Sequence, residues 1–362
     1  MFAVRAVVLH LSHATFEEGW ERVESLAYRL LDVKSEVERD LMIPVNSIRL
    51  VLPPLPDVNF LELAKNIDKR KPDMVMASVG NIPATHSQLE EAVAEIARLD
   101  LIAGILLDDR SWSTALRVST VLHKIADENV NYPTRIGVNT LGEPIVTPYF
   151  PLAYSQGDRD IVTVSLLYPN YLLEAYQRGG LEELERAVAR AGRVGLDVAE
   201  KAARILGAEV GGVDLSVSPW MNESSLGLTE AVAGTKMPKP GYAWGVRVVN
   251  DVLEKVAETL PSLGYNEVQL PIAEDSRLKV RVVESSVTAR DLARLSGVCL
   301  AGLDLAVVPA DVEGVAGLIL EVAAYSKTKR KPLGVRVVPL AGVEPGDKVA
   351  FKLFGETPVI PI

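Results

Sequence analysis

Short apolar runs alternate with long amphipathic runs from one end of the chain to the other. The short runs span four to nine residues, are mostly β-branched and are nearly continuous in hydrophobicity, which is typical of strands buried on both faces. They predict ten strands, at residues 3–11, 47–52, 74–79, 102–107, 135–139, 161–167, 212–217, 267–272, 303–308 and 335–338.

The long runs between these strands predict helices. In the run 16–41, Val23, Leu26 and Leu30 recur at steps of three and four residues, which places them on one helical face. The other predicted helices are 59–68, 87–99, 113–126, 181–206, 244–260, 289–295 and 312–324. Because parallel neighbouring strands need crossover connections, strands joined by helices predict a mostly parallel α/β fold.

The number of strands favours an unusual architecture. Eight strands would suggest the common barrel, and five or six a doubly wound sheet. Here the chain has ten strands, five before about residue 140 and five after it. We predict one domain over 1–362, with a first half at about 1–140, a connecting lid-like segment at 141–159, a second half at about 160–340 and a C-terminal tail at 341–362. The segment is too apolar for a solvated linker, and weak alternation in the tail predicts a hairpin.

Composition narrows the class of protein. The chain has 38 Lys+Arg and 48 Asp+Glu, a net charge of −10, which argues against a dedicated nucleic-acid or anionic-membrane surface. A single cysteine, Cys299, excludes an internal disulfide and a multi-thiolate metal site, and no apolar run approaches the roughly 18 residues of a membrane span. We expect a cytoplasmic protein, and a homo-oligomer is an open alternative to a monomer. Scarce glutamine and cysteine with plentiful Val, Glu and Arg favour a thermophilic source.

Carboxylates collect where the predicted strands end. Asp108 follows the strand 102–107, and Glu274 and Asp275 follow the strand 267–272. Ligands of parallel α/β proteins bind beyond the carboxyl ends of strands, so these acids suit general acid/base chemistry, a divalent metal or a polar substrate. Further polar candidates are Ser216, Ser218, Asn222 and Asn250 as orienting groups and Arg110 for an anionic substituent. The alternative for Asp275 and similar residues is helix N-capping.

Two further acids interrupt apolar strands. Asp214 lies in GVDLSVSP and Asp304 in GLDLAVVP. A carboxylate inside a buried strand must be paired, hydrogen-bonded or protonated. Each is therefore either a catalytic or metal-binding acid, or a structural acid satisfied by backbone amides or an arginine.

Other common chemistries have little support. His10 and His13 are three residues apart at a strand end, which disfavours a metal pair. No P-loop occurs and no GxGxxG follows a strand, so nucleotide cofactors are unsupported. Cys299 has apolar neighbours, as an inert buried cysteine does.

Several strings together resemble a known family. GVDLSVSP (212–219), LPIAED (270–275), VCLAGLDLAVVP (298–309) and GVRVVPL (334–340) are similar to domain of unknown function 711, also called uncharacterised protein family 0210. That family is grouped with the pyruvate formate-lyase-like barrels. The resemblance implies a ten-stranded β/α barrel made of two five-stranded parallel halves. It does not imply glycyl-radical chemistry, because Gly355 in LFGETP is a poor match for a radical-bearing glycine.

Two hypotheses for the function follow from these observations. The first is that the protein is a non-radical enzyme that acts on a small polar metabolite by carboxylate acid/base or metal-assisted chemistry. Its candidate acids are Asp214, Asp304, Glu274, Asp275 and Asp108. The alternative is a non-catalytic ligand-binding or regulatory protein on the same barrel. The cofactor is unknown, and a divalent metal stays an open choice.

Overall fold

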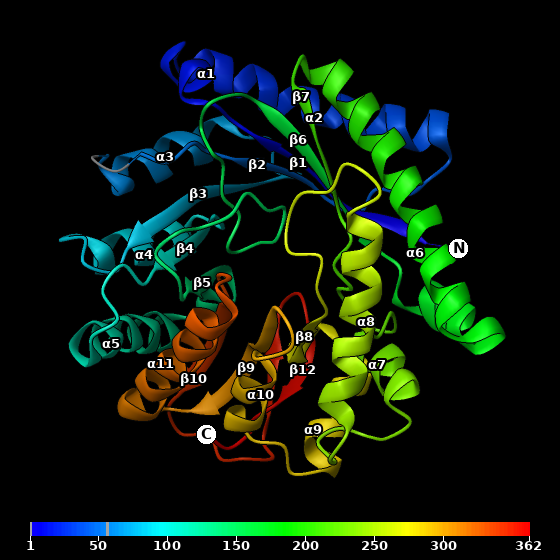
Figure 1. Ribbon diagram of the computed structural model, residues 1–362. Coiled ribbons are helices and arrows are strands. Elements are labelled where there is room, and N and C mark those ends of the chain that lie inside the picture. Colours follow the sequence, from blue (N-terminus) through cyan, green and yellow to red (C-terminus); the bar gives the residue numbers. More distant parts are fainter. Residues whose placement is uncertain (1, 56–57) are drawn as a thin grey trace.

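The computed structural model describes residues 2–55 and 58–362, and its main feature is a ten-stranded, mostly parallel sheet (Figure 1). The strands lie in the order β7-β6-β1-β2-β3-β4-β5-β10-β9-β8. Their bounds are β1 Ala3–His10, β2 Ile48–Val51, β3 Val75–Pro83, β4 Ile102–Leu106, β5 Ile136–Asn139, β6 Ile161–Leu167, β7 Glu209–Asp214, β8 Gln269–Pro271, β9 Ala301–Pro309 and β10 Gly334–Leu340. Each of the ten predicted strands is present, and the mostly parallel α/β class is confirmed.

Helices connect the strands and cover the outside of the sheet (Figure 1). Their bounds are α1 His13–Glu17, α2 Trp20–Leu41, α3 Phe60–Arg70, α4 Leu89–Arg98, α5 Trp112–Glu128, α6 Pro169–Leu206, α7 Ser225–Ala233, α8 Tyr242–Ala257, α9 Ser276–Glu284, α10 Ala289–Leu295 and α11 Val312–Lys329, with 3-10 turns η1 Tyr132–Arg135 and η2 Ile272–Glu274. None of the described helices is long and apolar enough to cross a membrane.

The helices differ from the prediction where glycine or burial changes the pattern. The predicted helix 16–41 is split into α1 and α2 at Gly19, whose φ of 103° is non-helical. Helix α6 begins before the predicted 181 and bends at Gly179 and Gly180. Helix α7 was not predicted, because its first five residues, from Ser225 to Thr229, are all buried and it lacks an amphipathic contrast. Helix α9 was also missed.

The two halves of the sheet are parallel inside and antiparallel where they meet. Strands β1 to β5 pair in parallel with their sequence neighbours. Strand β6 then pairs antiparallel with β1, and β10 pairs antiparallel with β5. Two edges of the sheet run across the ends of its strands. The carboxyl ends of β1–β5 lie at one of these edges, and those of β6–β10 lie at the other.

The connecting segment 141–159 packs against the sheet. Residues Thr147 and Leu152 are buried, and Figure 1 shows this stretch in the middle of the view, among the strands. Strands β5 and β10 carry glycine where the segment approaches. A Cβ on Gly137 would lie 2.4 Å from Pro151 Cγ, and one on Gly334 would lie 2.9 Å from Leu152 Cδ1. The backbone contact thus depends on strand positions without a side chain.

The C-terminal hairpin is confirmed. Strands β11 Lys348–Phe351 and β12 Gly355–Pro358 pair antiparallel with each other. The Ile360 amide then donates to the Val307 carbonyl at 2.9 Å, which attaches the end of the hairpin to β9. Phe351 and Phe354 pack with the apolar residues on that side of β9 and β10.

The close approach at Gly137 gives a first prediction. We expect Gly137→Ala to lower the free energy of unfolding by about 1–3 kcal/mol, because the added methyl group overlaps Pro151. Denaturant unfolding measures this difference. Gly142→Ala is the matched control, since its nearest atom would be Arg110 Nη2 at 3.7 Å, an ordinary contact. Equal stability of the two variants would contradict the packing described for the segment.

Candidate functional site

A cavity of about 1040 Å³ opens at the edge where β1–β5 begin and β6–β8 end. Arg5, Arg49 and Met76 line it from the first half of the sheet, and Ser165 and Glu274 line it from the second half. Both halves therefore contribute to one site, because their antiparallel junctions bring starting strands beside ending strands. A volume of this size suits a small-molecule ligand.

Arg336 connects two buried carboxylates beside this cavity. Its Nε lies 2.6 Å from Asp304 Oδ1 and its Nη2 lies 3.3 Å from Glu274 Oε1. Arg336 and Asp304 are register partners on β10 and β9, so the parallel pairing itself brings the two charges together. The register shifts directly after this pair, where Leu305 adopts a φ of 48°. Such an irregularity redirects side chains and is common next to binding sites.

Arg5 and Tyr149 extend the network at its two ends. The Arg5 guanidinium pairs with the other Glu274 oxygen and donates to the Pro219 carbonyl at 2.9 Å. The Tyr149 hydroxyl donates to Asp304 Oδ2 at 2.8 Å. Burial, together with the charge of Asp304, raises the pKa of Tyr149 well above its usual range, so the phenol keeps its proton. Both carboxylates are thus held by fixed donors.

Arg49 is different because its partners are neutral. Its Nε donates to Ser47 Oγ at 3.0 Å and its Nη1 donates to the Pro148 carbonyl at 3.2 Å. The guanidinium lies 4.7 Å from the centre of the Phe150 ring. Within residues 2–55 and 58–362, no carboxylate lies within 4.0 Å of it.

The surroundings of Arg49 disfavour its charge. Burial, and then the like charge of Arg5, lower the pKa of Arg49 to about 9, so the charged form still predominates at pH 7. An unpaired cation in a desolvated place is unfavourable, and it gains most from an anion that enters the cavity. Because Arg49 also lines the cavity, the geometry provides an anion-binding position.

Among the residues predicted for the site, Glu274 lines the cavity directly, and Asp304 contacts it through Arg336. Asp214 also lines it, but its carboxylate accepts hydrogen bonds from the amides of Ser216, Tyr265 and Asn266, at 2.9, 3.2 and 3.1 Å. The Ser216 hydroxyl donates to the same carboxylate at 2.5 Å. The Asp214 charge is therefore held by backbone amides, as the structural alternative for it proposed.

Two other candidates, Asp275 and Asn250, hold elements together. Asp275 is the N-cap of α9 and also accepts from the Ser224 hydroxyl and the Leu226 amide. Asn250 accepts from the Val268 amide and donates to the Val298 carbonyl. Ser218, by contrast, lines the cavity.

Asp108, Arg110 and Asn222 lie outside the cavity. Asp108 follows β4 and binds the Thr85 amide at 3.2 Å on the exposed opposite edge. Arg110 and Asn222 are exposed. Asp108 therefore does not join Glu274, because the antiparallel junctions send the carboxyl ends of β4 and β8 to opposite edges.

His10 and His13 form hydrogen-bond contacts, and Cys299 is buried. His10 Nε2 lies 2.8 Å from Thr163 Oγ1, and both His13 nitrogens lie against backbone carbonyls. In the part of the chain that the structure describes, no three His, Cys, Asp or Glu side chains come together in a way that could hold a metal. Burial raises the pKa of the Cys299 thiol to about 12, which makes it unreactive at neutral pH.

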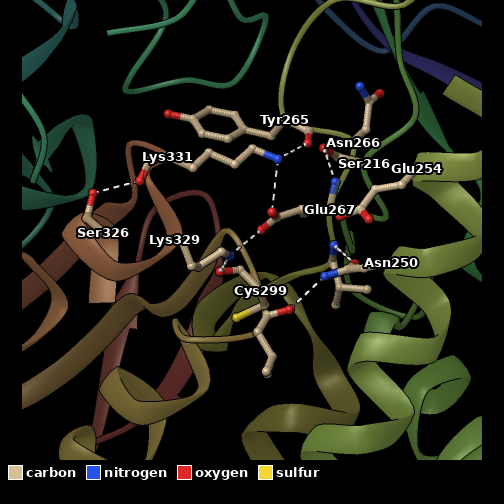
Figure 2. A network of polar contacts seen from close by, with 12 residues as sticks. Ser216, Asn250, Glu254, Tyr265, Asn266, Glu267, Cys299, Ser326, Lys329 and Lys331 are labelled. Atoms are coloured by element: carbon tan, nitrogen blue, oxygen red, sulfur yellow. Dashed lines mark hydrogen bonds and ion pairs between the residues drawn. The ribbon is translucent and has the colours of Figure 1, made fainter. Parts of the chain in front are cut away.

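Figure 2 shows a second polar network, centred on Glu267. Its two carboxylate oxygens pair with Lys329 and Lys331, each at 2.9 Å, and Lys331 also donates to the Tyr265 carbonyl at 2.7 Å. Asn250 lies in the same view. This network fixes the end of α11 against the start of β8, and the role that the contacts support is structural.

Sequence reasoning overlooked the three arginines. Arg5, Arg49 and Arg336 interrupt the apolar runs AVRAVV, IRLV and GVRVV in the same way as Asp214 and Asp304 interrupt theirs. The rule that a charge inside a buried strand needs a partner applies to arginine as well, and it was the available signal.

The chain is similar in sequence to proteins of an uncharacterised family. The model of a family described as Uncharacterised ACR (DUF711) matches residues 78–352. The chain is 26% identical to a UPF0210 protein of Methanopyrus kandleri, over 94% of this chain and 85% of the relative. It is 28% identical to a UPF0210 protein of Pyrobaculum arsenaticum, over 90% and 80%, and 25% identical to one of Corynebacterium glutamicum, over 95% and 82%. The names of these relatives state no activity.

The Glu267 network gives the second prediction. We expect Glu267→Gln to lower the free energy of unfolding by about 2 kcal/mol, because two half-buried lysines lose their common counter-ion. Glu356→Gln removes an exposed partner of Lys348 and is the control, with an expected change below about 0.5 kcal/mol. Denaturant unfolding of both variants tests this. A loss as small as that of the control would show that the network does not stabilise the fold.

Proposed function

The chain belongs to the uncharacterised DUF711 family, and we propose that it binds a small anionic metabolite in the cavity beside Arg49. The single observation that carries this proposal is the half-buried guanidinium of Arg49, which has no carboxylate partner in the described chain. The planar fork of an arginine matches the two oxygens of a carboxylate or phosphate.

The neighbouring charges support this position for the anion. Arg5 and Arg336 share Glu274, so each is held in place but already has a partner. Arg49 has donors left, since a guanidinium carries five N–H groups and two hydrogen bonds from it are found. Fixed donors of this kind bind an anion with little reorganisation.

We also propose that the sheet closes into a ten-stranded barrel, with the cavity at one mouth. The first and last strands in the order of the sheet are β7 and β8. Parallel bridges at Val213–Ser262 and Val217–Val268 support the closure, as do hydrogen bonds of 3.2 Å from the Val217 amide to the Glu267 carbonyl and 3.0 Å from the Gln269 amide to the Val217 carbonyl. A closed barrel made of two parallel halves is also the fold that the resemblance to the pyruvate formate-lyase-like group implies.

Catalysis on the bound ligand is a second candidate. The Tyr149 hydroxyl favours it, because this hydroxyl belongs to a residue that lines the cavity and is oriented by Asp304. If the single O–H of this phenol turns from Asp304 toward a bound anion, it can donate a hydrogen bond to the anion. The carboxylates themselves are engaged by Arg5 and Arg336, which supports a positioning role for them.

The binding proposal is tested with Arg49→Gln. We expect simple anions such as benzoate, acetate and phosphate to raise the melting temperature of the wild type, and to leave that of the variant unchanged. An anion at one hundred times its dissociation constant adds about 2.7 kcal/mol. Without anion, Arg49→Gln should be as stable as the wild type or more stable, because an unpaired, half-buried charge is removed.

Arg117 offers a matched control for this experiment. It too donates to carbonyl oxygens, those of Ala84 and His86 at 2.9 and 2.8 Å, but lies away from the cavity. We expect Arg117→Gln to keep the response to anions. If Arg49→Gln responded as strongly as the wild type, the proposed function would be wrong.

The catalytic candidate is tested with Tyr149→Phe. We expect the wild type to consume a component of a metabolite extract, and Tyr149→Phe to do so at least about 100-fold more slowly while it still responds to anions. Mass spectrometry of the extract measures consumption. Tyr28→Phe, which changes an exposed tyrosine, is the control. If the wild type left the extract unchanged, the catalytic candidate would be wrong, and the binding proposal would not be affected.

A further inference from the structure

The tip of the C-terminal hairpin forms part of the cavity wall. Three successive residues between β11 and β12 line the cavity, namely Lys352, Leu353 and Phe354. We infer that this tip selects the ligand: Leu353 and Phe354 bind the apolar end of an elongated molecule whose anionic end lies at Arg49. The inference rests on the proposed function and deepens it, because it names the ligand class as an anion with a long apolar body, such as a carboxylate with an alkyl chain.

The tip is held in place from both halves of the sheet. The Lys352 amide donates to Asn131 Oδ1 at 3.0 Å, and Asn131 directly precedes η1 in the first half. On the other side, Lys279 Nζ of α9 donates to the Phe354 carbonyl at 2.6 Å. These two hydrogen bonds fix the backbone of the tip, so its side chains present a defined surface to a ligand.

A row of contacts joins the tip to the ion pairs near Arg49. The rings of Phe354 and Trp220 pack edge to face, with their centres 6.0 Å apart. The Arg5 guanidinium lies 5.4 Å from the centre of the Trp220 ring, and it pairs with Glu274. All of these residues line the same cavity as Arg49. One cavity therefore offers a cation at Arg49 and an apolar surface at Trp220 and Phe354.

Leu353 is unusual among the apolar residues of the surface. It is 60% exposed, and among the large apolar residues that the described chain exposes it is the one that lines the cavity. An apolar side chain in water at a cavity gains when a ligand covers it, because buried apolar surface stabilises a complex. Phe354 is itself buried. The two residues therefore supply a buried and an exposed part of one apolar contact.

A long body fits the cavity. The volume is about 1040 Å³, of which a carboxylate group occupies only a small part. Apolar side chains also line the cavity near Arg49, because Met76 is its register partner on β3 and the Phe150 ring lies 4.7 Å from its guanidinium. An alkyl chain that runs from Arg49 to the tip is thus buried along its length, and each buried methylene group strengthens binding.

The experiment uses straight-chain carboxylates that differ in length: acetate, hexanoate and decanoate, each below its micelle concentration. We expect the full-length wild type, titrated by calorimetry, to bind decanoate at least about tenfold tighter than hexanoate, and hexanoate more tightly than acetate. Decanedioate has a second carboxylate at its far end, which would lose hydration against Leu353 and Phe354, so it should bind at least about tenfold more weakly than decanoate. Decanedioate that binds as tightly as decanoate would assign the tip to Lys352 and overturn the apolar end.

Two variants test the tip directly. We expect Leu353→Ala and Phe354→Ala to bind decanoate at least about fivefold more weakly than the wild type, with unchanged affinity for acetate. Phe351→Ala is the control for Phe354→Ala, because Phe351 belongs to the same hairpin and the same apolar cluster but lies outside the cavity lining. Leu181→Ala changes an exposed leucine of α6 and is the control for Leu353→Ala. Both controls should keep the affinity for decanoate. Leu353→Ala alters an exposed side chain, so it still tests the inference if Phe354→Ala does not fold.

The outcomes separate this inference from the proposed function. Equal affinities of the wild type for hexanoate and decanoate would overturn the long apolar body. Tip variants that bind decanoate as tightly as the wild type, or no more weakly than their controls, would overturn the role of the tip. Anion binding at Arg49 would stand in each of these cases. Acetate and hexanoate that bind the wild type and Arg49→Gln equally, or bind neither, would overturn the proposed function and this inference with it.

Discussion

The site depends on the antiparallel junctions between two parallel half-sheets. If all ten strands ran the same way, the charged residues near the start of β1 and β2 would lie far from those at the end of β8. Because β1 pairs antiparallel with β6 and β5 with β10, Arg5 and Arg49 lie at the same edge as Glu274. The polarity of these junctions therefore decides which residues can meet.

Pairing of opposite charges across neighbouring elements explains why this interior tolerates so many of them. Arg336 and Asp304 are register partners, and Glu274 lies between two guanidinium groups. Removal of one member would leave a buried charge alone, which is far more unfavourable than the absence of both. These ion pairs therefore hold Arg5, Glu274, Arg336 and Asp304 in place. Arg49 lies beside them, and within the described chain it has no counter-ion.

The strands were predictable because a buried parallel strand has a continuous apolar pattern that needs no knowledge of its neighbours. The C-terminal hairpin and most helices were predictable for the same local reason. Helix α7 was not, since it is buried at Leu226 and Leu228 and lacks a polar face near its start. Asp108 was placed in the site because its position after a strand is visible in the sequence, whereas the direction of the junctions is not.

The acids illustrate why a motif alone cannot separate structure from function. Asp214 and Asp304 occupy similar strings, yet Asp214 accepts hydrogen bonds from the amides of Tyr265 and Asn266, and Asp304 is held by an arginine and a tyrosine. The difference lies in residues 50 or more positions away for Asp214 and 155 away for the Tyr149 partner of Asp304. Only the folded arrangement reveals which charges are paired. Our proposal therefore rests on an arginine, Arg49, where the sequence pointed to carboxylates.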